Sequence, residues 1–356
     1  MTPPEVILDR FVRTRLCHNP GCRGYIGKLD IDRVQSPSFR AFLYLVQETM
    51  NEALRQEGVN ASGGVVHRPF HFDYLDVADA SANAHAFQHE DSAFIVVTLP
   101  MVELVWRLTH ALSRSPRIRQ LLSAAPDSLD ADSLQGLLFQ IQLNFLVSHE
   151  YTHHVHGHCV DAPGAMAGLW TEFLGDAKNG NLKAQAQELD ADGYAIYLAL
   201  AHLLRSERRE TALGQLGWGS ASTRDGDEQL LTCFFLSELA FFCAFWRGGI
   251  DMESVYEFLH PPPPVRIKYA IQVAQMWCGQ NDSVAASWFS PARFQGFFGA
   301  AAEAIGGTAR RDWDAQMSFL RSTDGARYDG QLFELFEAMR QKRDEPMLGI
   351  PLATKA

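Results

Sequence analysis

One short motif limits what this chain can fold into more than any other feature. Residues 149–153 read His-Glu-Tyr-Thr-His, the H-E-x-x-H arrangement. Two histidines four positions apart point to the same side of a helix, so His149 and His153 can bind one zinc ion. Glu150 is placed to act as general base toward a metal-activated water. Such a site requires a helix here and a third ligand elsewhere in the chain.

The third ligand is expected after the motif. The metzincin pattern H-E-x-x-H-x-x-G-x-x-H fails, because its glycine and its last histidine are replaced by His156 and Cys159. Glu188 instead stands near the start of an otherwise apolar helix, and Asp192 lies one turn later on the same face. We therefore expect Glu188 to bind the ion and Asp192 to accept the free N–H of a ligand histidine.

Two alternatives for the third ligand stay open at this point. Glu172, followed by Asp176, repeats the same spacing 19 residues after His153. His156 shares the helix face of the motif, although a core position or one behind the ligands suits it better.

The hydrophobic pattern predicts an α+β protein that is mostly helical, with a small sheet ahead of the helix that carries the motif. Extended segments are expected over 65–76 and 93–99. Helices are expected over 38–57, 100–112, 130–156, 184–204, 229–246 and 265–278, with further helices to about 343. We expect a helical and basic segment over 1–60, the core over 61–280 and a helical extension over 281–356.

Charge and cysteine content narrow the classes of partner and compartment. The formal net charge of −11 argues against a nucleic-acid binder and against binding to an anionic membrane surface. The N-terminus has no apolar signal segment, and six scattered cysteines in 356 residues suit a reducing cytoplasm. Cys17, His18 and Cys22 lack both a standard zinc spacing and a fourth ligand, so we expect a turn with two free thiols there.

The most apolar run of the chain, 230–246, is 17 residues long and carries Glu238 at its centre. A central acid opposes membrane insertion, so a buried core helix is favoured over a membrane-associated segment.

Four segments together resemble the gluzincin metallopeptidases of the HtpX and CAAX prenyl endopeptidase type. These segments are His149-Glu150-x-x-His153 with His158, Glu188-x-x-Ala191-Asp192, Asn83-Ala84-His85-Ala86-Phe87 ahead of Phe94–Thr98, and His260-Pro261-Pro262 with Arg266-Ile267. They extend over residues 65–278 in the order of the family. Two departures are the insertion of His85 in the third segment and the lack of evident flanking membrane spans, which indicates a soluble branch.

The resemblance implies a zincin-like metallopeptidase core with one catalytic Zn²⁺. It implies that His158 supports the ligands from behind. It further implies that His260 and Arg266 return to the active site, to stabilise an oxyanion or to fix an acidic group. An edge strand near Asn83 and Ala84, including Phe94 and Val96, would bind a peptide by strand addition.

These observations predict a zinc endopeptidase that acts on a protein or peptide substrate, with His149, His153 and Glu188 as ligands and Glu150 as base. Two other functions stay open. One is a scaffold or sensor that keeps the zinc fold without catalysis, and the other is a zinc hydrolase of a non-peptide amide.

Overall fold

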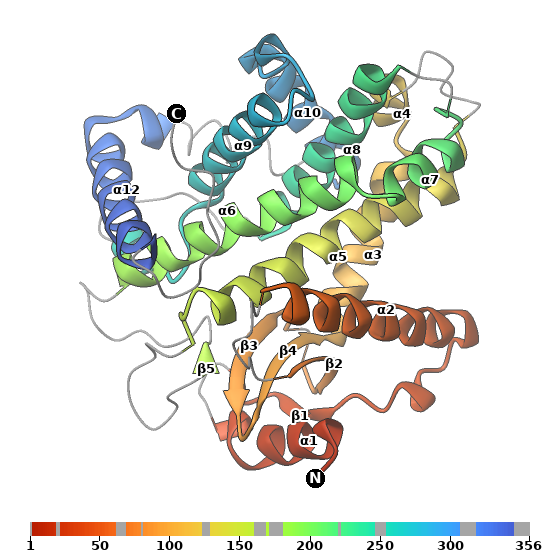
Figure 1. The fold of residues 1–356 in the computed structure, drawn as a ribbon, viewed down its shortest axis with the longest axis vertical. Helices are drawn as coiled ribbons and strands as arrows, with labels where there is room; N and C mark the ends of the chain where they lie inside the picture. Colours follow the sequence, from red (N-terminus) through yellow and green to blue (C-terminus); the bar gives the residue numbers. More distant parts are fainter. Residues whose placement is uncertain are drawn as a thin grey trace. The chain divides into compact units, whose positions relative to one another are not determined.

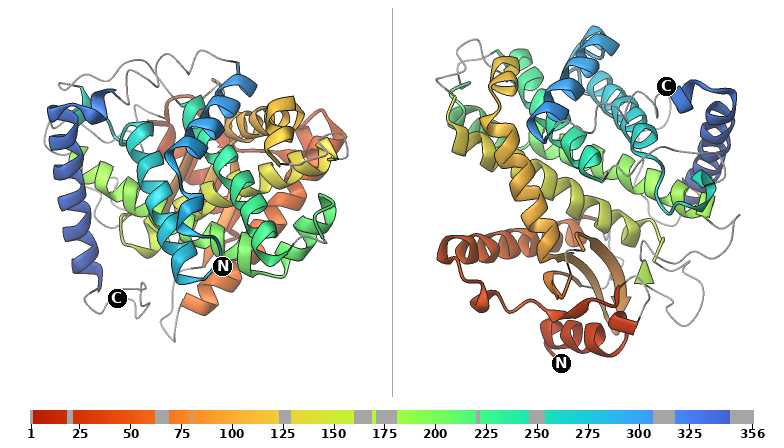
Figure 2. Two further views of the ribbon diagram at one scale, coloured as in Figure 1. Left: turned by 90° about the horizontal axis from the view of Figure 1, so that it is seen from above. Right: turned by 180° about the vertical axis from the view of Figure 1, so that it is seen from behind.

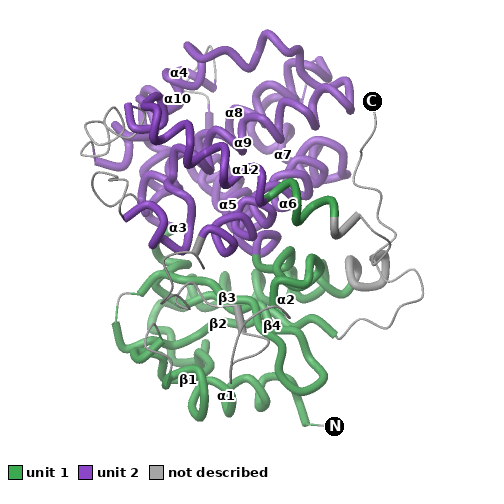
Figure 3. Tube along the Cα trace, turned by 90° about the vertical axis from the view of Figure 1, so that its left-hand side faces the viewer, with its two compact units in different colours: residues 1–104, 150–175, 336–356 green, residues 105–149, 176–335 purple. Residues whose placement is uncertain are grey.

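A computed structural model describes most of the chain and divides it into two compact units (Figure 3). Unit 1 comprises residues 1–104, 150–175 and 336–356, and unit 2 comprises 105–149 and 176–335. The boundary falls inside three continuous helices: α3 (Leu99–Arg114), α5 (Ala131–Val155) and α12 (Thr323–Asp344). The described residues are 2–18, 22–61, 69–79, 81–122, 129–159, 169–170, 181–219, 222–245, 254–306 and 318–344.

Unit 1 is built on a five-stranded mixed sheet with strand order β1-β2-β4-β3-β5. Its strands are β1 (Tyr25–Lys28), β2 (Phe70–Val77), β3 (Ala84–His89), β4 (Ser92–Thr98) and β5 (Leu169–Trp170). β2 and β4 are parallel, and the other neighbouring pairs are antiparallel. The sequence-based expectation of a mostly helical protein with a small sheet is confirmed.

The helix α1 (Pro4–Thr14) covers one face of this sheet (Figure 2). Its apolar side, with Leu8 and Phe11, packs against Phe87, Phe94 and Val96 of the two neighbouring strands. The rings of Phe11, Phe87 and Phe94 follow one another, with centroid distances of 4.6 and 5.2 Å. Burial of these aromatic side chains fixes which face of β3 and β4 points inward.

The edge-strand expectation for Phe94 and Val96 is wrong. β4 lies between β2 and β3, and both of its sides are paired along their length. A continuous apolar run such as Ala93–Val97 is typical of an interior strand, because both faces of such a strand are buried. The strand beside it, β3, pairs on its outer side with β5 at two positions, Ala86 and Phe87.

The helix α2 (Pro37–Ala61) lies along the outer edge of β2, beyond the point where β1 ends. The last β1–β2 pair joins Lys28 and Leu75. Beyond it, the Asn51 side chain replaces a strand: its Nδ2 donates to the Phe72 carbonyl at 2.9 Å, and its Oδ1 accepts from the Phe72 N–H at 2.8 Å. One amide thus satisfies both backbone groups of an otherwise open edge.

Unit 2 is helical (Figure 1). α9 packs along α6, and α8 packs against α10. The 3-10 turns η1 and η3 belong to unit 1, and η5 and η6 to unit 2. The bounds are α4 (Pro116–Leu122), α6 (Asn181–Arg205), α7 (Arg208–Gln215), α8 (Thr223–Ala244), α9 (Pro263–Gln280), α10 (Pro291–Ala304), η1 (Leu16–His18), η3 (Ile31–Arg33), η5 (Val255–Glu257) and η6 (Ala286–Trp288).

The apolar run of the sequence forms α8, which is buried from Leu230 to Cys243. An aromatic cluster on Phe235 includes Trp288 and Phe294, with centroid distances of 6.0 and 4.7 Å to Phe235. Among the described helices, none is long and apolar enough to cross a membrane. The burial of this run confirms the expected core helix.

We expect Asn51→Ala to lower the free energy of unfolding by about 1–3 kcal/mol, because the N–H and C=O of Phe72 both lose their partner. Urea denaturation measures the change. Glu48→Ala, on an exposed position of the same helix, is the control and should stay within about 0.5 kcal/mol. Equal effects of the two substitutions would contradict the edge-closing role of Asn51.

The buried histidine of β3 makes unit 1 sensitive to acid. His85 hydrogen-bonds the Tyr25 hydroxyl, and its burial lowers its pKa to about 3. Between about pH 6 and pH 3 the unfolded chain therefore binds a proton that the folded chain does not, so stability falls by about 1.4 kcal/mol per pH unit. Removing the titrating ring with His85→Gln should move the acid-unfolding midpoint, followed by circular dichroism, to lower pH. An unchanged midpoint would show that another group controls acid unfolding.

Candidate metal centre

The centre of the site is the His149 imidazole of α5, which lies between two carboxylates of α6. Its Nδ1 is 3.0 Å from Asp192 Oδ1, and its Nε2 is 3.1 Å from Glu188 Oε2. Glu188 and Asp192 are one helical turn apart, so both side chains point from α6 toward the same ring. All three residues are buried.

Between its two carboxylates, the His149 ring is stable only with a positive charge, either on the ring itself or on a neighbouring ion. Nδ1 donates to Asp192, which leaves Nε2 and the Glu188 carboxylate facing each other as two lone-pair donors. Burial disfavours the charged ring, but Glu188, followed by Asp192, raises the pKa of His149 to about 10. The gap between Nε2 and Glu188 therefore needs a proton or a metal cation, and both atoms are good ligands for zinc.

Arg266 of α9 neutralises the Asp192 carboxylate. Its Nε and Nη2 both donate to Asp192, each at 2.7 Å, and its guanidinium lies 4.9 Å from the centroid of the Phe242 ring. Burial opposes ionisation of Asp192, but the Arg266 guanidinium, together with His149, holds the pKa of Asp192 below its usual range. Asp192 is thus an acceptor that can fix the orientation of the His149 ring.

His260 returns to the same group of side chains, just ahead of α9. Its Nε2 lies 3.5 Å from Glu188 Oε2, and about a quarter of its side chain (25%) is exposed. Of the two roles that were open for Arg266, the bidentate pair with Asp192 favours fixing an acidic group. The His260 side chain is more exposed than that of Arg266.

The helix α5 continues without a break beyond His149 and carries Glu150 and His153 on its next turn. Both are buried, with 4% and 1% of their surface exposed. His149, His153 and Glu188 each offer one ligand atom, and these atoms lie within 4.8 Å of one another. These buried groups could hold a metal ion.

Histidines after the motif take separate roles. His158 Nδ1 is 2.9 Å from His153 Nδ1, so one ring donates to the other. His154 points away from the ligands and donates from Nε2 to the Phe94 carbonyl at 2.9 Å. Within unit 1, His154 therefore joins the last turn of α5 to β4, and His158 contacts a candidate ligand.

A second group was not predicted from the sequence. His156, His158 and Asp190 also offer ligand atoms within 4.8 Å of one another. Asp190 stands in the acidic run Glu188-Leu189-Asp190-Ala191-Asp192, where helical spacing drew attention only to the first and last residues. The density of acids in that run was the available signal.

The remaining predicted residues are placed as follows. Asn83 lies just before β3; its N–H donates to Thr98 Oγ1 at 2.9 Å, and its Oδ1 accepts from the N–H of Ala84 at 2.9 Å. Both residues are buried at the start of β3. Cys17 and Cys22 are not joined in a disulfide, and no candidate metal group in the described part of the chain includes them or His18. The alternative ligand Glu172 and its neighbour Asp176 lie outside the described residues.

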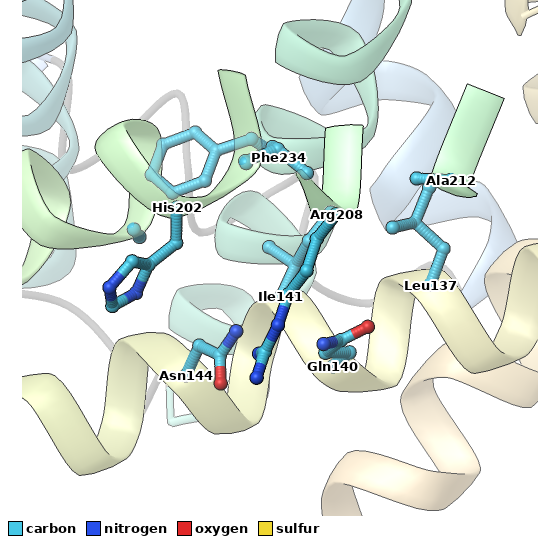
Figure 4. Close-up of a pocket in the computed structure, with 10 residues that line it drawn as sticks. Leu137, Gln140, Ile141, Asn144, His202, Arg208, Ala212 and Phe234 are labelled. Carbon is cyan, nitrogen blue, oxygen red and sulfur yellow. The ribbon is translucent and has the colours of Figure 1, made fainter. Parts of the chain in front are cut away.

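Unit 2 has a pocket that shares none of the candidate ligands (Figure 4). It lies among α5, α6, α7 and α8, and its polar members are Gln140, Asn144, His202 and Arg208. In Figure 4 the Arg208 side chain extends from α7 toward Asn144 of α5. The pocket is thus separate in its residues from the group around His149.

Comparison with known proteins gave no match: no family model, no curated protein and no solved structure matches the chain.

We expect Arg266→Gln to lower the free energy of unfolding by about 3 kcal/mol or more, because it leaves the buried Asp192 carboxylate without its cation. Arg266→Lys keeps the charge but loses the two-pronged contact, so its effect should be intermediate. Arg327→Gln removes an exposed pair with Asp324 in the same unit and is the control, with an expected change of at most about 1 kcal/mol. Equal losses in Arg266→Gln and Arg327→Gln would refute the role of Arg266.

Proposed function

We propose that this protein is a zinc-dependent endopeptidase with a zincin-like core. The observation that carries the proposal is the donor group of His149, His153 and Glu188 with Glu150 beside it on the same helix. Two imidazoles and one carboxylate are a ligand set typical of catalytic zinc sites, which keep a further position for water. A bound zinc ion supplies a Lewis acid that lowers the pKa of water toward 7 and polarises a substrate carbonyl.

In this proposal Glu150 is the general base. Its carboxylate is buried beside a ligand, where it takes the proton of the attacking water and later delivers it to the leaving amine. A scaffold or sensor has no need of such a carboxylate, so Glu150 favours an enzyme over the silent alternative.

His260 is proposed to donate a hydrogen bond to the oxyanion that forms on the substrate. It approaches Glu188 to 3.5 Å and keeps part of its ring exposed, which suits a group that meets substrate. Arg266 and Asp192 act through His149 as positioning residues, because their hydrogen bonds are made to each other and to that ring. His158 would orient His153 in the same way.

The proposed substrate is a protein or peptide segment in extended form. We propose that it pairs with β3 rather than with the interior strand β4, because among the described residues the outer side of β3 is paired at Ala86 and Phe87 alone. Asn83 and Ala84 stand at the start of that strand. A reducing, cytoplasmic setting stays a prediction from cysteine usage.

Metal analysis tests the ligand set. His149→Ala, His153→Ala and Glu188→Ala should each reduce bound zinc, measured by plasma mass spectrometry after dialysis, from about one ion per chain to a small fraction. His154→Gln alters the same helix away from the ligands and should keep the ion. Full zinc retention by Glu188→Ala would transfer the third ligand to Glu172 or His156.

Glu150→Gln tests the reaction. This variant should keep zinc but lose cleavage by about 10²–10⁴-fold, because the general base is absent. Mapping of new protein N-termini in cells that express wild type or Glu150→Gln identifies both activity and substrate. Identical sets of N-termini from the two zinc-loaded proteins would contradict a peptidase and favour a scaffold or a hydrolase of a non-peptide amide.

A further inference from the structure

A buried carboxyl group in unit 2 has no role in the site described so far. Glu238 stands in the middle of α8 with 2% of its surface exposed. Neither of its carboxyl oxygens has a hydrogen-bond partner within the described part of the chain. Asp227 of the same helix is equally buried but binds both Arg205 and Arg209, at 3.0 and 2.8 Å. An unpaired ionised carboxylate is very costly to bury, so Glu238 is held as a neutral acid.

The face of α8 that carries Glu238 also carries Phe242, which contacts Arg266 of the site. Phe242 follows Glu238 by one helical turn and lies on the same face. Its ring lies under the Arg266 guanidinium at 4.9 Å, and its centroid is 6.0 Å from that of Phe145. The Phe145 ring is in turn 6.2 Å from the His149 ring. Glu238 is thus one turn away from a chain of contacts that ends at a candidate ligand.

The charges that act on Glu238 come from three helices. Besides burial, the Asp192 carboxylate raises the pKa of Glu238, while Arg266 and His149 lower it. α4 and α10 also pack against α8, and their charged pair Arg117–Glu303 is exposed at the surface. The state of Glu238 therefore depends on the net charge around His149.

That net charge changes when a divalent ion binds. A divalent ion brings two positive charges to this buried group of side chains. Release of one ligand proton offsets only one of them, so the net charge around His149 rises. A positive charge in a dry interior favours ionisation of a neighbouring acid.

We propose that Glu238 is the charge-compensating acid of the metal centre, neutral without the ion and ionised with it. This inference rests on the proposed metal site. The O–H bond of Glu238 breaks and its proton passes to the buffer, and no electrons are transferred. Glu238 is thereby a positioning residue that stabilises the loaded centre without touching the ion.

Calorimetric titration of the full metal-free chain with zinc tests the inference. Runs in buffers of different ionisation enthalpy give the number of protons released per ion. We expect wild type to release about one proton more than Glu238→Gln, and to bind zinc more tightly. Equal proton release with zinc bound to both proteins would overturn the inference alone. Failure of wild type to bind zinc would overturn the metal centre and the inference with it.

A second readout needs no variant. The infrared spectrum of the metal-free wild type should contain the C=O band of a buried protonated carboxyl group, and zinc should replace it by carboxylate bands. Persistence of the protonated band in the zinc-loaded protein would overturn the inference.

Thermal melting without metal tests whether Glu238 is neutral in the folded protein, unlike a buried acid that is ionised and paired. An acid with a raised pKa in the folded state loses stability as pH rises above its unfolded value of 4.5. Glu238→Gln should therefore melt above wild type at pH 8, and the gap should close near pH 5. The paired acid Asp227→Asn is the matched control and should melt below wild type at both values. A lower melting temperature of Glu238→Gln at pH 8 would contradict a neutral Glu238.

Discussion

The rest of the site depends on the placement of one imidazole between two carboxylates. Glu188 and Asp192 approach opposite nitrogens of His149 at 3.1 and 3.0 Å in a buried environment. In water such a contact is weak, but away from solvent it demands a compensating cation. Either a proton on His149 or a divalent metal ion can supply this positive charge. The carboxylates around His149 therefore favour the binding of a cation.

The helices of unit 2 supply this arrangement from distant parts of the chain. Arg266 lies 74 residues beyond Asp192, and its two hydrogen bonds keep that carboxylate ionised and oriented. His149 consequently presents Nδ1–H to Asp192 and turns Nε2 toward Glu188. The buried rings of Phe145 and Phe242 lie beside this chain of contacts. A neutral acid such as Glu238 can lie nearby without competing for the guanidinium.

Local sequence patterns predicted those features of the fold and the site that depend on residues close together in the chain. Helical spacing placed Glu188 and Asp192 on one face, and apolar periodicity located the long helices. β1 and β3 were missed because they are short and contain few β-branched residues. No helix was expected over 208–215, which forms α7. Register and strand order are long-range properties, so β4 was wrongly placed at an edge. No spacing rule could choose between oxyanion binding and an ion pair for Arg266, because that choice depends on the folded position of Asp192.

X-ray absorption spectroscopy of the zinc-loaded full-length protein tests the central claim most directly, because it reports the atoms bound to the ion. We predict a shell of nitrogen and oxygen ligands at about 2.0–2.2 Å, with the outer-shell pattern of two imidazoles and no sulfur. Loss of one imidazole in His153→Ala would assign that ligand. A zinc–sulfur distance of about 2.3 Å, or a shell without imidazole, would contradict a centre made by His149, His153 and Glu188.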